Sequence, residues 1–127
     1  YKFQLNIARK LIFSKWKAAL GGNVKGSASG SATLQTRLLK LYLAAGIPIY
    51  EGYGLTEAGP CLSVNCIKRG MKIGTVGIPL IDIEIKLAED GEILAKGKNI
   101  MHGYYKNPVA TAEVLKDGWL YTGDIGE

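Results

Sequence analysis

The spacing of apolar residues changes between the two halves of this chain, and that change limits the folds it can adopt. Up to about residue 46, apolar side chains recur every three or four positions, which is the period of an amphipathic helix. Over residues 81–87 they alternate with charged side chains, which is the period of a strand with one face in solvent. We therefore predict an α/β fold in which a helix-rich half precedes a mostly antiparallel half.

Helix stop signals divide the first half into a strand–helix–strand unit. A first helix is predicted over residues 3–20, followed by a short strand over 24–29, a second helix and a strand over 47–51. Gly46 is the predicted C-terminal cap of the second helix, and Pro48 prevents its continuation. The predicted inward positions are Leu5, Ala8, Ile12, Trp16 and Ala19 in the first helix, and Leu34, Leu38, Leu41 and Ala45 in the second. This order of elements favours a parallel βαβ unit.

Turn and cap residues organise the second half. The turn Glu89-Asp90-Gly91 joins the alternating strand to a returning strand over residues 92–96. Asn107-Pro108 predicts the start of a helix, with Asn as its cap and Pro in its first turn. We expect that helix to end near residue 117 and to be followed by a strand over 119–121.

The two halves are predicted to be portions of one domain. We expect residues 1–70 to form its α/β portion and residues 71–127 its antiparallel, β-barrel-like portion, with the junction near residues 68–76. The chain opens inside a predicted helix and stops directly after a turn. We therefore expect it to be a piece of a longer protein.

Composition excludes several classes of protein. With 47% hydrophobic and 21% charged residues, the chain is not a disordered one, and it holds no apolar run long enough to span a membrane. Cys61, Cys66 and a single histidine are too few for a structural zinc site or a secreted disulfide scaffold. Free thiols in a reducing cytoplasm are the simplest interpretation, so a cytoplasmic location is predicted.

Charge is distributed unevenly. Residues 1–46 hold eight Lys and Arg side chains and no acidic one, within a net charge of +5 for the whole chain. Aromatic residues do not alternate with these cations as they do on single-strand binding surfaces, so we predict no nucleic-acid partner. A solvated face is the simplest role of the basic first helix, and peripheral contact with an anionic membrane is its alternative. Unpaired sheet edges predict self-association of this piece.

A glycine-rich segment, Gly52-Tyr53-Gly54-Leu55-Thr56-Glu57, directly follows a predicted strand. It is not a dinucleotide fingerprint, because Glu57 occupies the third glycine position, and it is not a P-loop, because no Gly-Lys-Ser/Thr follows. One interpretation is a plain strand-to-helix turn with Thr56 as N-cap. The other is a ligand site in which Tyr53 stacks on a planar group, Thr56 contacts a phosphate and Glu57 binds Mg²⁺.

The segment Tyr-Gly-Leu-Thr-Glu closely resembles a core motif of the adenylate-forming (AMP-binding) enzymes. That family includes acyl-CoA synthetases, firefly-type luciferases and peptide-synthetase adenylation domains. Further segments resemble its motifs in the right order: Ser29-Gly30-Ser31-Ala32-Thr33-Leu34, Gly74-Thr75-Val76-Gly77-Ile78-Pro79, Gly91-Glu92-Ile93-Leu94 with Gly103-Tyr104-Tyr105, and Asp117-Gly118-Trp119-Leu120-Tyr121-Thr122-Gly123-Asp124. Within the family, Glu51-Gly52-Tyr53 and Ser63-Val64-Asn65 look most like the long-chain fatty acyl-CoA synthetases.

The resemblance implies a ligase that activates a fatty acid with ATP and transfers the acyl group to coenzyme A. Tyr53 would stack on adenine opposite the Ser31-Ala32 backbone, and Asp124 would bind the ribose hydroxyls. The catalytic residues would be Thr56, at the α-phosphate, and Glu57, as the Mg²⁺ ligand. The implied nucleotide-binding residues are Gly30, Ser31, Ala32, Gly52, Tyr53, Gly54, Thr56 and Asp124.

The chain departs from the family pattern in two respects. Ser31 and Thr33 stand where the family commonly has Gly and Pro. The phosphate loop ending in Pro-Lys-Gly, the hinge and the C-terminal domain with its lysine are absent, so this piece alone is not expected to catalyse the reaction. Two alternatives stay open: adenylation of another carboxylate, such as an aryl or amino acid, and a non-catalytic nucleotide-binding remnant.

Overall fold

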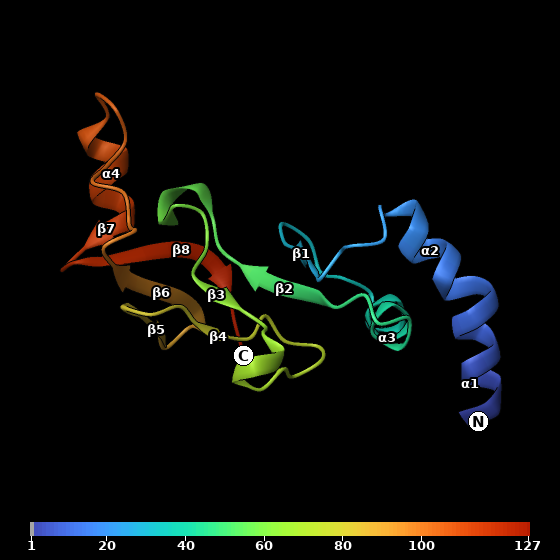
Figure 1. Ribbon diagram of the computed structural model, residues 1–127. Coiled ribbons are helices and arrows are strands. Elements are labelled where there is room, and N and C mark those ends of the chain that lie inside the picture. The colour runs from blue at the N-terminus through green and yellow to red at the C-terminus, as the bar shows by residue number, and fades with distance from the viewer. Residues whose placement is uncertain (1) are drawn as a thin grey trace.

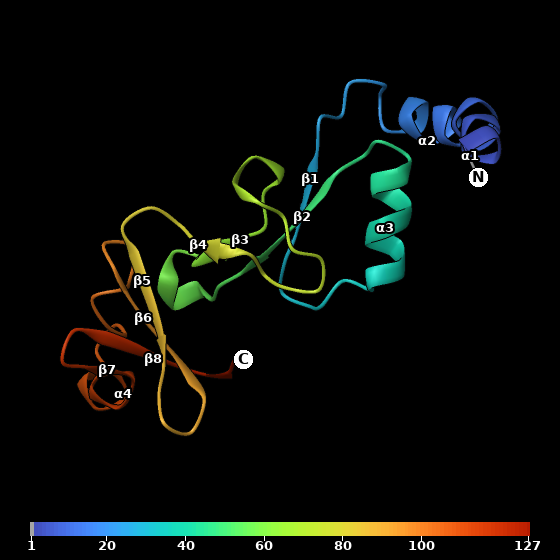
Figure 2. The same cartoon turned by 90° about the horizontal axis from the view of Figure 1, so that it is seen from below.

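A computed structural model describes residues 2–127 as two four-stranded sheets with helices at both ends (Figure 1). The helical segments are α1 (Lys2–Ala8), η1 (Arg9–Phe13), α2 (Ser14–Ala19), α3 (Thr36–Ala44), η2 (Thr56–Ala58), η3 (Ile67–Arg69) and α4 (Pro108–Val114). The strands are β1 (Ser27–Ser29), β2 (Ile49–Tyr53), β3 (Ser63–Val64), β4 (Ile78–Pro79), β5 (Ile83–Leu87), β6 (Glu92–Gly97), β7 (Leu115–Lys116) and β8 (Trp119–Ile125). Figures 1 and 2 show them in a row, from α1 through the first and second sheets to α4.

The first sheet has the order β1-β2-β3-β4 and contains the predicted βαβ unit. Strand β1 pairs in parallel with β2, and α3 connects them, whereas β2–β3 and β3–β4 are antiparallel pairs. Strand β2 begins two residues later than predicted. The reason is local, because the Ile47 N–H closes the helix by donating to the Tyr42 carbonyl (2.9 Å) and Pro48 has no N–H to pair. Gly46 adopts φ +70° and caps α3, as predicted.

The buried faces of the helices differ from the predicted ones. In α3 the fully buried residue is Leu39, whereas Leu38 and Leu41 are exposed. In the first helix Phe13 is buried and Ile12 is 49% exposed. A π-helical turn over η1 explains the second difference, because its wider i→i+5 repeat rotates the inward face by one residue. In α3, packing against the neighbouring elements decides that Leu39 is the buried residue, and the apolar period of the sequence carries no information about that packing.

The second sheet has the order β5-β6-β8-β7, and every neighbouring pair is antiparallel. The predicted turn and helix cap are both present: Gly91 has φ +86°, and the Asn107 side chain accepts from the Ala110 N–H at 3.1 Å. Helix α4 ends at Val114, earlier than predicted, because the left-handed pair Asp117-Gly118 folds β7 back onto β8 as a hairpin. Within residues 2–127 the sheets stay open and form no closed barrel.

A small apolar core joins the two sheets. Ala58 and Leu62 follow β2 in the chain, and they pack with Ala95 of β6 and Leu120 of β8, all of them at most 1% exposed. The change from one sheet to the other falls between residues 79 and 83, since β4 still pairs with β3. This core holds the ends of β2 and β8 against each other, and that junction creates the site described next.

Candidate active site

A cleft of about 1480 Å³ separates the two sheets at the ends of β2 and β8. It is lined by most of the residues that the sequence predicts for nucleotide binding: Ser31, Ala32, Gly52, Tyr53, Gly54 and Asp124. Gly30, Thr56 and Glu57, also predicted as site residues, are not part of its lining. The fold therefore brings together three segments that are far apart in the sequence.

Tyr53 and Asp124 meet across this cleft. The Tyr53 hydroxyl donates a hydrogen bond of 2.8 Å to Asp124 Oδ2, which joins residues 71 positions apart. Burial, together with the hydrogen bond and negative charge of Asp124, raises the pKa of Tyr53 to about 12, against a lowering hydrogen bond with Thr122. The contact aligns an aromatic face and a carboxylate at one end of the cleft.

Alkaline pH is expected to destabilise the protein through Tyr53. The pKa of Tyr53 is higher in the folded than in the unfolded protein, so its protonated phenol stabilises the folded state. This contribution is fully present below pH 10 and is lost as the pH rises toward 12. Because Tyr53 is half-buried, solvent screening reduces the effect to about 1 kcal/mol. Tyr53→Phe should therefore lose less stability than the wild type over this range in urea unfolding. Identical losses in both proteins would contradict the assignment.

Gly54 is required by the packing of the chain on itself. A Cβ at this position would collide with the Pro60 carbonyl oxygen and would lie 2.7 Å from the Cys61 Cα. The returning chain is held here because the Leu62 N–H donates to the Tyr53 carbonyl at 2.8 Å. The glycine therefore closes the turn that follows Tyr53, a role that the glycine-rich motif alone does not reveal.

The loop that carries Ser31 and Ala32 is tied to β2 by a buried carboxylate. Glu51 is 8% exposed, and its Oε1 accepts a 3.3 Å hydrogen bond from the Leu34 N–H. Ser31 adopts φ +64°, a left-handed conformation that favours glycine. Glycine is the residue commonly found at this position in the family that the motif resembles. The motifs alone do not reveal this role of Glu51, and the one signal for it in the sequence is a lone acidic residue inside an apolar strand.

Thr56 and Glu57 lie in η2, the short turn beyond the cleft. The N-cap of η2 is Leu55 and makes no side-chain cap, so the interpretation of Thr56 as an N-cap is wrong. Glu57 faces residues that follow β6. Its Oε1 accepts from the Tyr104 hydroxyl at 2.8 Å, and its carbonyl accepts from the Met101 N–H at 2.8 Å. The bond to the carboxylate raises the pKa of Tyr104.

Comparison with known proteins identifies the family. Residues 4–105 match the family described as AMP-binding enzyme. The chain belongs to the AMP-binding enzyme family. It is 44% identical over 117 residues to the long-chain-fatty-acid–CoA ligase FadD15 of Mycobacterium bovis, covering 92% of this chain and 19% of that ligase. The resemblance inferred from the sequence motifs, including the likeness to long-chain acyl-CoA ligases, is therefore confirmed.

Solved structures agree with this assignment. The Mycobacterium tuberculosis fatty acyl CoA synthetase superposes with a TM-score of 0.76 at 26% identity, covering 97% of this chain and 26% of that one. The o-succinylbenzoate CoA synthetase of Bacillus subtilis, solved in complex with ATP and magnesium ion, gives a TM-score of 0.72 at 29% identity, covering 88% and 27%. The chain thus spans about a fifth to a quarter of the length of these relatives.

Glu57 fits a magnesium ion bound to phosphates but not a self-contained metal site. Within the described residues 2–127, no group of three or more His, Cys, Asp or Glu side chains is arranged to hold a metal ion. Mg²⁺ in phosphate-transferring proteins commonly takes one or two carboxylates, with phosphate oxygens and waters completing its shell. One carboxylate, with one oxygen engaged by Tyr104, matches that pattern for this AMP-binding chain.

The cleft also has an apolar part and a wall that is held by hydrogen bonds. Apolar side chains from both sheets line it: Ile78, Ile85, Leu87, Ile93 and Ile125. Residues 70–77 form one wall of the cleft. Asn65, which is 1% exposed, holds this wall through hydrogen bonds to the backbone of Lys72 and Thr75. The motif Ser63-Val64-Asn65 does not reveal this role of Asn65, because its partners lie seven and ten residues away.

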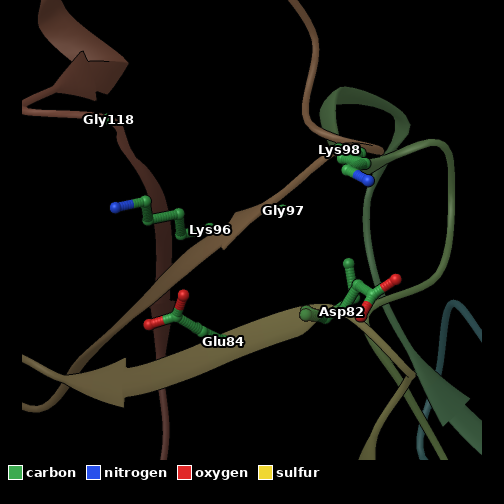
Figure 3. Close-up of a pocket in the computed structure, with 7 residues that line it drawn as sticks. Asp82, Glu84, Lys96, Gly97, Lys98 and Gly118 are labelled. Atoms are coloured by element: carbon green, nitrogen blue, oxygen red, sulfur yellow. The ribbon is translucent and has the colours of Figure 1, made fainter.

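A second hollow of about 550 Å³ lies on the second sheet, away from the cleft (Figure 3). Asp82, Glu84, Lys96 and Lys98 surround it, and all four side chains are exposed. The outward orientation of Asp82 and Glu84 agrees with the sequence prediction. Charges of both signs at an exposed surface are typical of a solvated strand face, so the cleft between the sheets remains the candidate site.

Proposed function

We propose that the longer protein containing this chain is an ATP-dependent long-chain fatty acid–CoA ligase. The observation that carries the proposal is the Tyr53–Asp124 hydrogen bond, which unites two motifs of the AMP-binding family in one cleft. The family match and the 44% identity to a long-chain-fatty-acid–CoA ligase support the substrate class. This chain alone is not expected to catalyse the reaction.

In this proposal the cleft between the sheets receives AMP. Tyr53 stacks on adenine, the Ser31-Ala32 backbone covers the other face, and Asp124 accepts hydrogen bonds from the ribose hydroxyls. Gly52 and Gly54 border the proposed nucleotide site in the cleft, and Gly30 precedes the loop residues Ser31 and Ala32. Gly54 also borders the fatty acid, for which the apolar lining of the cleft is chemically suited.

The proposed reaction has two balanced steps. A fatty carboxylate oxygen forms a bond to the α-phosphorus of ATP while the bond to the pyrophosphate oxygen breaks, giving acyl-AMP and pyrophosphate. The thiol sulfur of coenzyme A then attacks the acyl carbon, loses its proton and displaces AMP. Both steps need alignment and charge neutralisation more than a protein nucleophile. Thr56 would hydrogen-bond the α-phosphate, and Glu57 would hold Mg²⁺, which neutralises phosphate charge when bound.

The proposal is tested by ATP–pyrophosphate exchange with the full-length protein. Exchange that is strongest with long fatty acids is expected, and short-chain, aryl and amino acids in the same panel serve as controls. Exchange that is strongest with an aryl or amino acid would transfer the proposal to that carboxylate. Absence of exchange with every acid, from a protein that is shown to be folded, would leave a non-catalytic nucleotide-binding remnant.

We also propose where the protein is located and what its surface contacts. Within residues 2–127 no helix combines the length and hydropathy needed to cross a bilayer. We propose a cytoplasmic location, and peripheral membrane contact through the basic first helix as the alternative to a solvated face. Exposed Phe3 and Ile7 beside the cations of that helix support the membrane contact. Ile81 and Ile125 are exposed beside the open second sheet, which supports the proposal that this piece associates with itself. The same exposed residues support a second proposal, that the complete protein extends this sheet toward a barrel-like unit.

A further inference from the structure

The segment that follows β6 braces the turn that carries Glu57. Asn99 Nδ2 donates to the carbonyls of Ala58 (2.6 Å) and Cys61 (3.1 Å), and the Met101 N–H donates to the Glu57 carbonyl (2.8 Å). The Tyr104 hydroxyl adds the bond to Glu57 Oε1 at 2.8 Å. Residues 99–104 therefore hold both the backbone of this turn and the side chain on it.

The backbone of Tyr104 is itself anchored to the start of α4. Its N–H donates to Thr111 Oγ1 at 2.9 Å, and that hydroxyl donates to the Asn107 carbonyl at 2.8 Å, at the start of α4. Tyr104 is 37% exposed, whereas its neighbour Tyr105 is 88% exposed. The Tyr104 hydroxyl is therefore held on Glu57 while its backbone is tied to the start of α4, and the Tyr105 ring points into solvent.

This anchoring has a chemical consequence for Glu57. A glutamate on a surface turn has three rotatable side-chain bonds and samples many positions, which weakens its binding of a cation. A hydroxyl fixed on one carboxylate oxygen restricts those rotations and leaves Oε2 free. Partners of this kind, which orient a metal-binding carboxylate without touching the metal, typically change metal affinity 10–100-fold.

We propose that Tyr104 is a positioning residue, which holds Glu57 Oε1 so that Oε2 binds the cation of Mg·ATP. The proposal rests on the function proposed above and adds a residue to it. Asn99 and Met101 hold the turn in place, and Tyr104 orients the carboxylate on it. The effect of the hydroxyl should therefore appear in the Mg²⁺ dependence of nucleotide binding and leave metal-free binding unchanged.

The test compares Tyr104→Phe with Tyr105→Phe in the full-length protein. Each variant removes a single hydroxyl from adjacent tyrosines, so Tyr105→Phe is the matched control. ATP affinity is measured by calorimetry in EDTA and in excess Mg²⁺. For Tyr104→Phe we expect the gain in affinity from Mg²⁺ to shrink about tenfold, with EDTA values unchanged. The free Mg²⁺ needed for half-maximal pyrophosphate exchange should rise by a similar factor, and Tyr105→Phe should match the wild type.

Other outcomes separate the two proposals. Wild-type protein without exchange activity overturns the proposed function itself, whatever Tyr104 does. Active wild type with Tyr104→Phe equal to Tyr105→Phe overturns the positioning role, and so does an equal loss of affinity with and without Mg²⁺, which indicates a merely structural contact. In a double-mutant cycle, Tyr104→Phe should have no further effect on Mg²⁺-dependent affinity once Glu57→Gln is present, and an additive effect would contradict the coupling.

Discussion

Replacing Asn65 with alanine is expected to release the wall formed by residues 70–77 from the cleft. The side chain donates to the carbonyls of Lys72 at 2.7 Å and Thr75 at 2.8 Å, and it accepts from the Lys72 N–H at 3.0 Å. At about 1 kcal/mol for each lost hydrogen bond, the wall loses about 3 kcal/mol. That corresponds to an increase of about 100-fold in the equilibrium for local opening.

Hydrogen exchange in the native protein measures this opening directly. The Lys72 amide loses its acceptor, so its exchange should accelerate most, and the Gly77 amide, which donates to the Thr75 hydroxyl, should follow. Asn23→Ala, at an exposed asparagine, is the control and should leave both amides protected. Unchanged protection at Lys72 in Asn65→Ala would show that the wall does not depend on this side chain.

A second variant separates lost hydrogen bonds from lost volume. Asn65→Asp keeps the shape of the side chain but places an oxygen where Nδ2 donates to two carbonyls. If hydrogen bonding holds the wall, Asn65→Asp should accelerate exchange at least as much as Asn65→Ala, because repulsion between oxygens replaces attraction. Near wild-type protection in Asn65→Asp would indicate that packing volume, and not hydrogen bonding, maintains the wall.

Asp124→Ala is expected to weaken ATP binding about 30-fold in the full-length protein. In the proposed function its carboxylate accepts hydrogen bonds from the ribose hydroxyls, and bonds to a charged group are worth about 2 kcal/mol. The KM for ATP in pyrophosphate exchange, together with equilibrium binding of ATP, measures the change. Glu84→Ala removes the same charge from an exposed position outside the cleft and should leave both values unchanged.

Tyr53→Phe distinguishes the proposed contact of Asp124 with ribose from its contact with Tyr53. It removes the hydroxyl that donates to Asp124 and keeps the aromatic ring for stacking. We expect ATP affinity within about threefold of the wild type, because the ring that stacks on adenine is kept and the lost bond joins Tyr53 to Asp124 and not to the nucleotide. Wild-type ATP affinity in Asp124→Ala, from a protein that remains folded, would remove Asp124 from the nucleotide site.

Features that depend on neighbouring residues could be predicted from the sequence. The Gly46 cap, the turn at Gly91 and the Asn107-Pro108 helix start all appear as expected, because each follows from backbone preferences within a few residues. The parallel pairing of β1 with β2 was predictable for a similar reason, since a helix between two strands brings them side by side in the same direction.

Features that depend on packing were not predictable in the same way. A π-helical turn makes Phe13 the buried residue in place of Ile12, although the regular apolar spacing favours Ile12. Helix α4 stops at Val114 because Leu115 pairs with Leu120 across a hairpin. In α4 a contact with another element outweighs the small local preference that the sequence pattern expresses, and in the first helix the π-helical turn rotates the inward face.

The sequence by itself determined the family, the helix and strand types and the nucleotide-site residues to examine, because motifs and caps are written in short stretches of chain. Only the tertiary structure decided which of those residues meet. Tyr53 contacts Asp124 and Glu57 contacts Tyr104 across separations of 71 and 47 residues, and Thr56 and Glu57 lie outside the cleft that holds the others. Such contacts arise when the core of Ala58, Leu62, Ala95 and Leu120 fixes the two sheets against each other, and no local pattern records that arrangement.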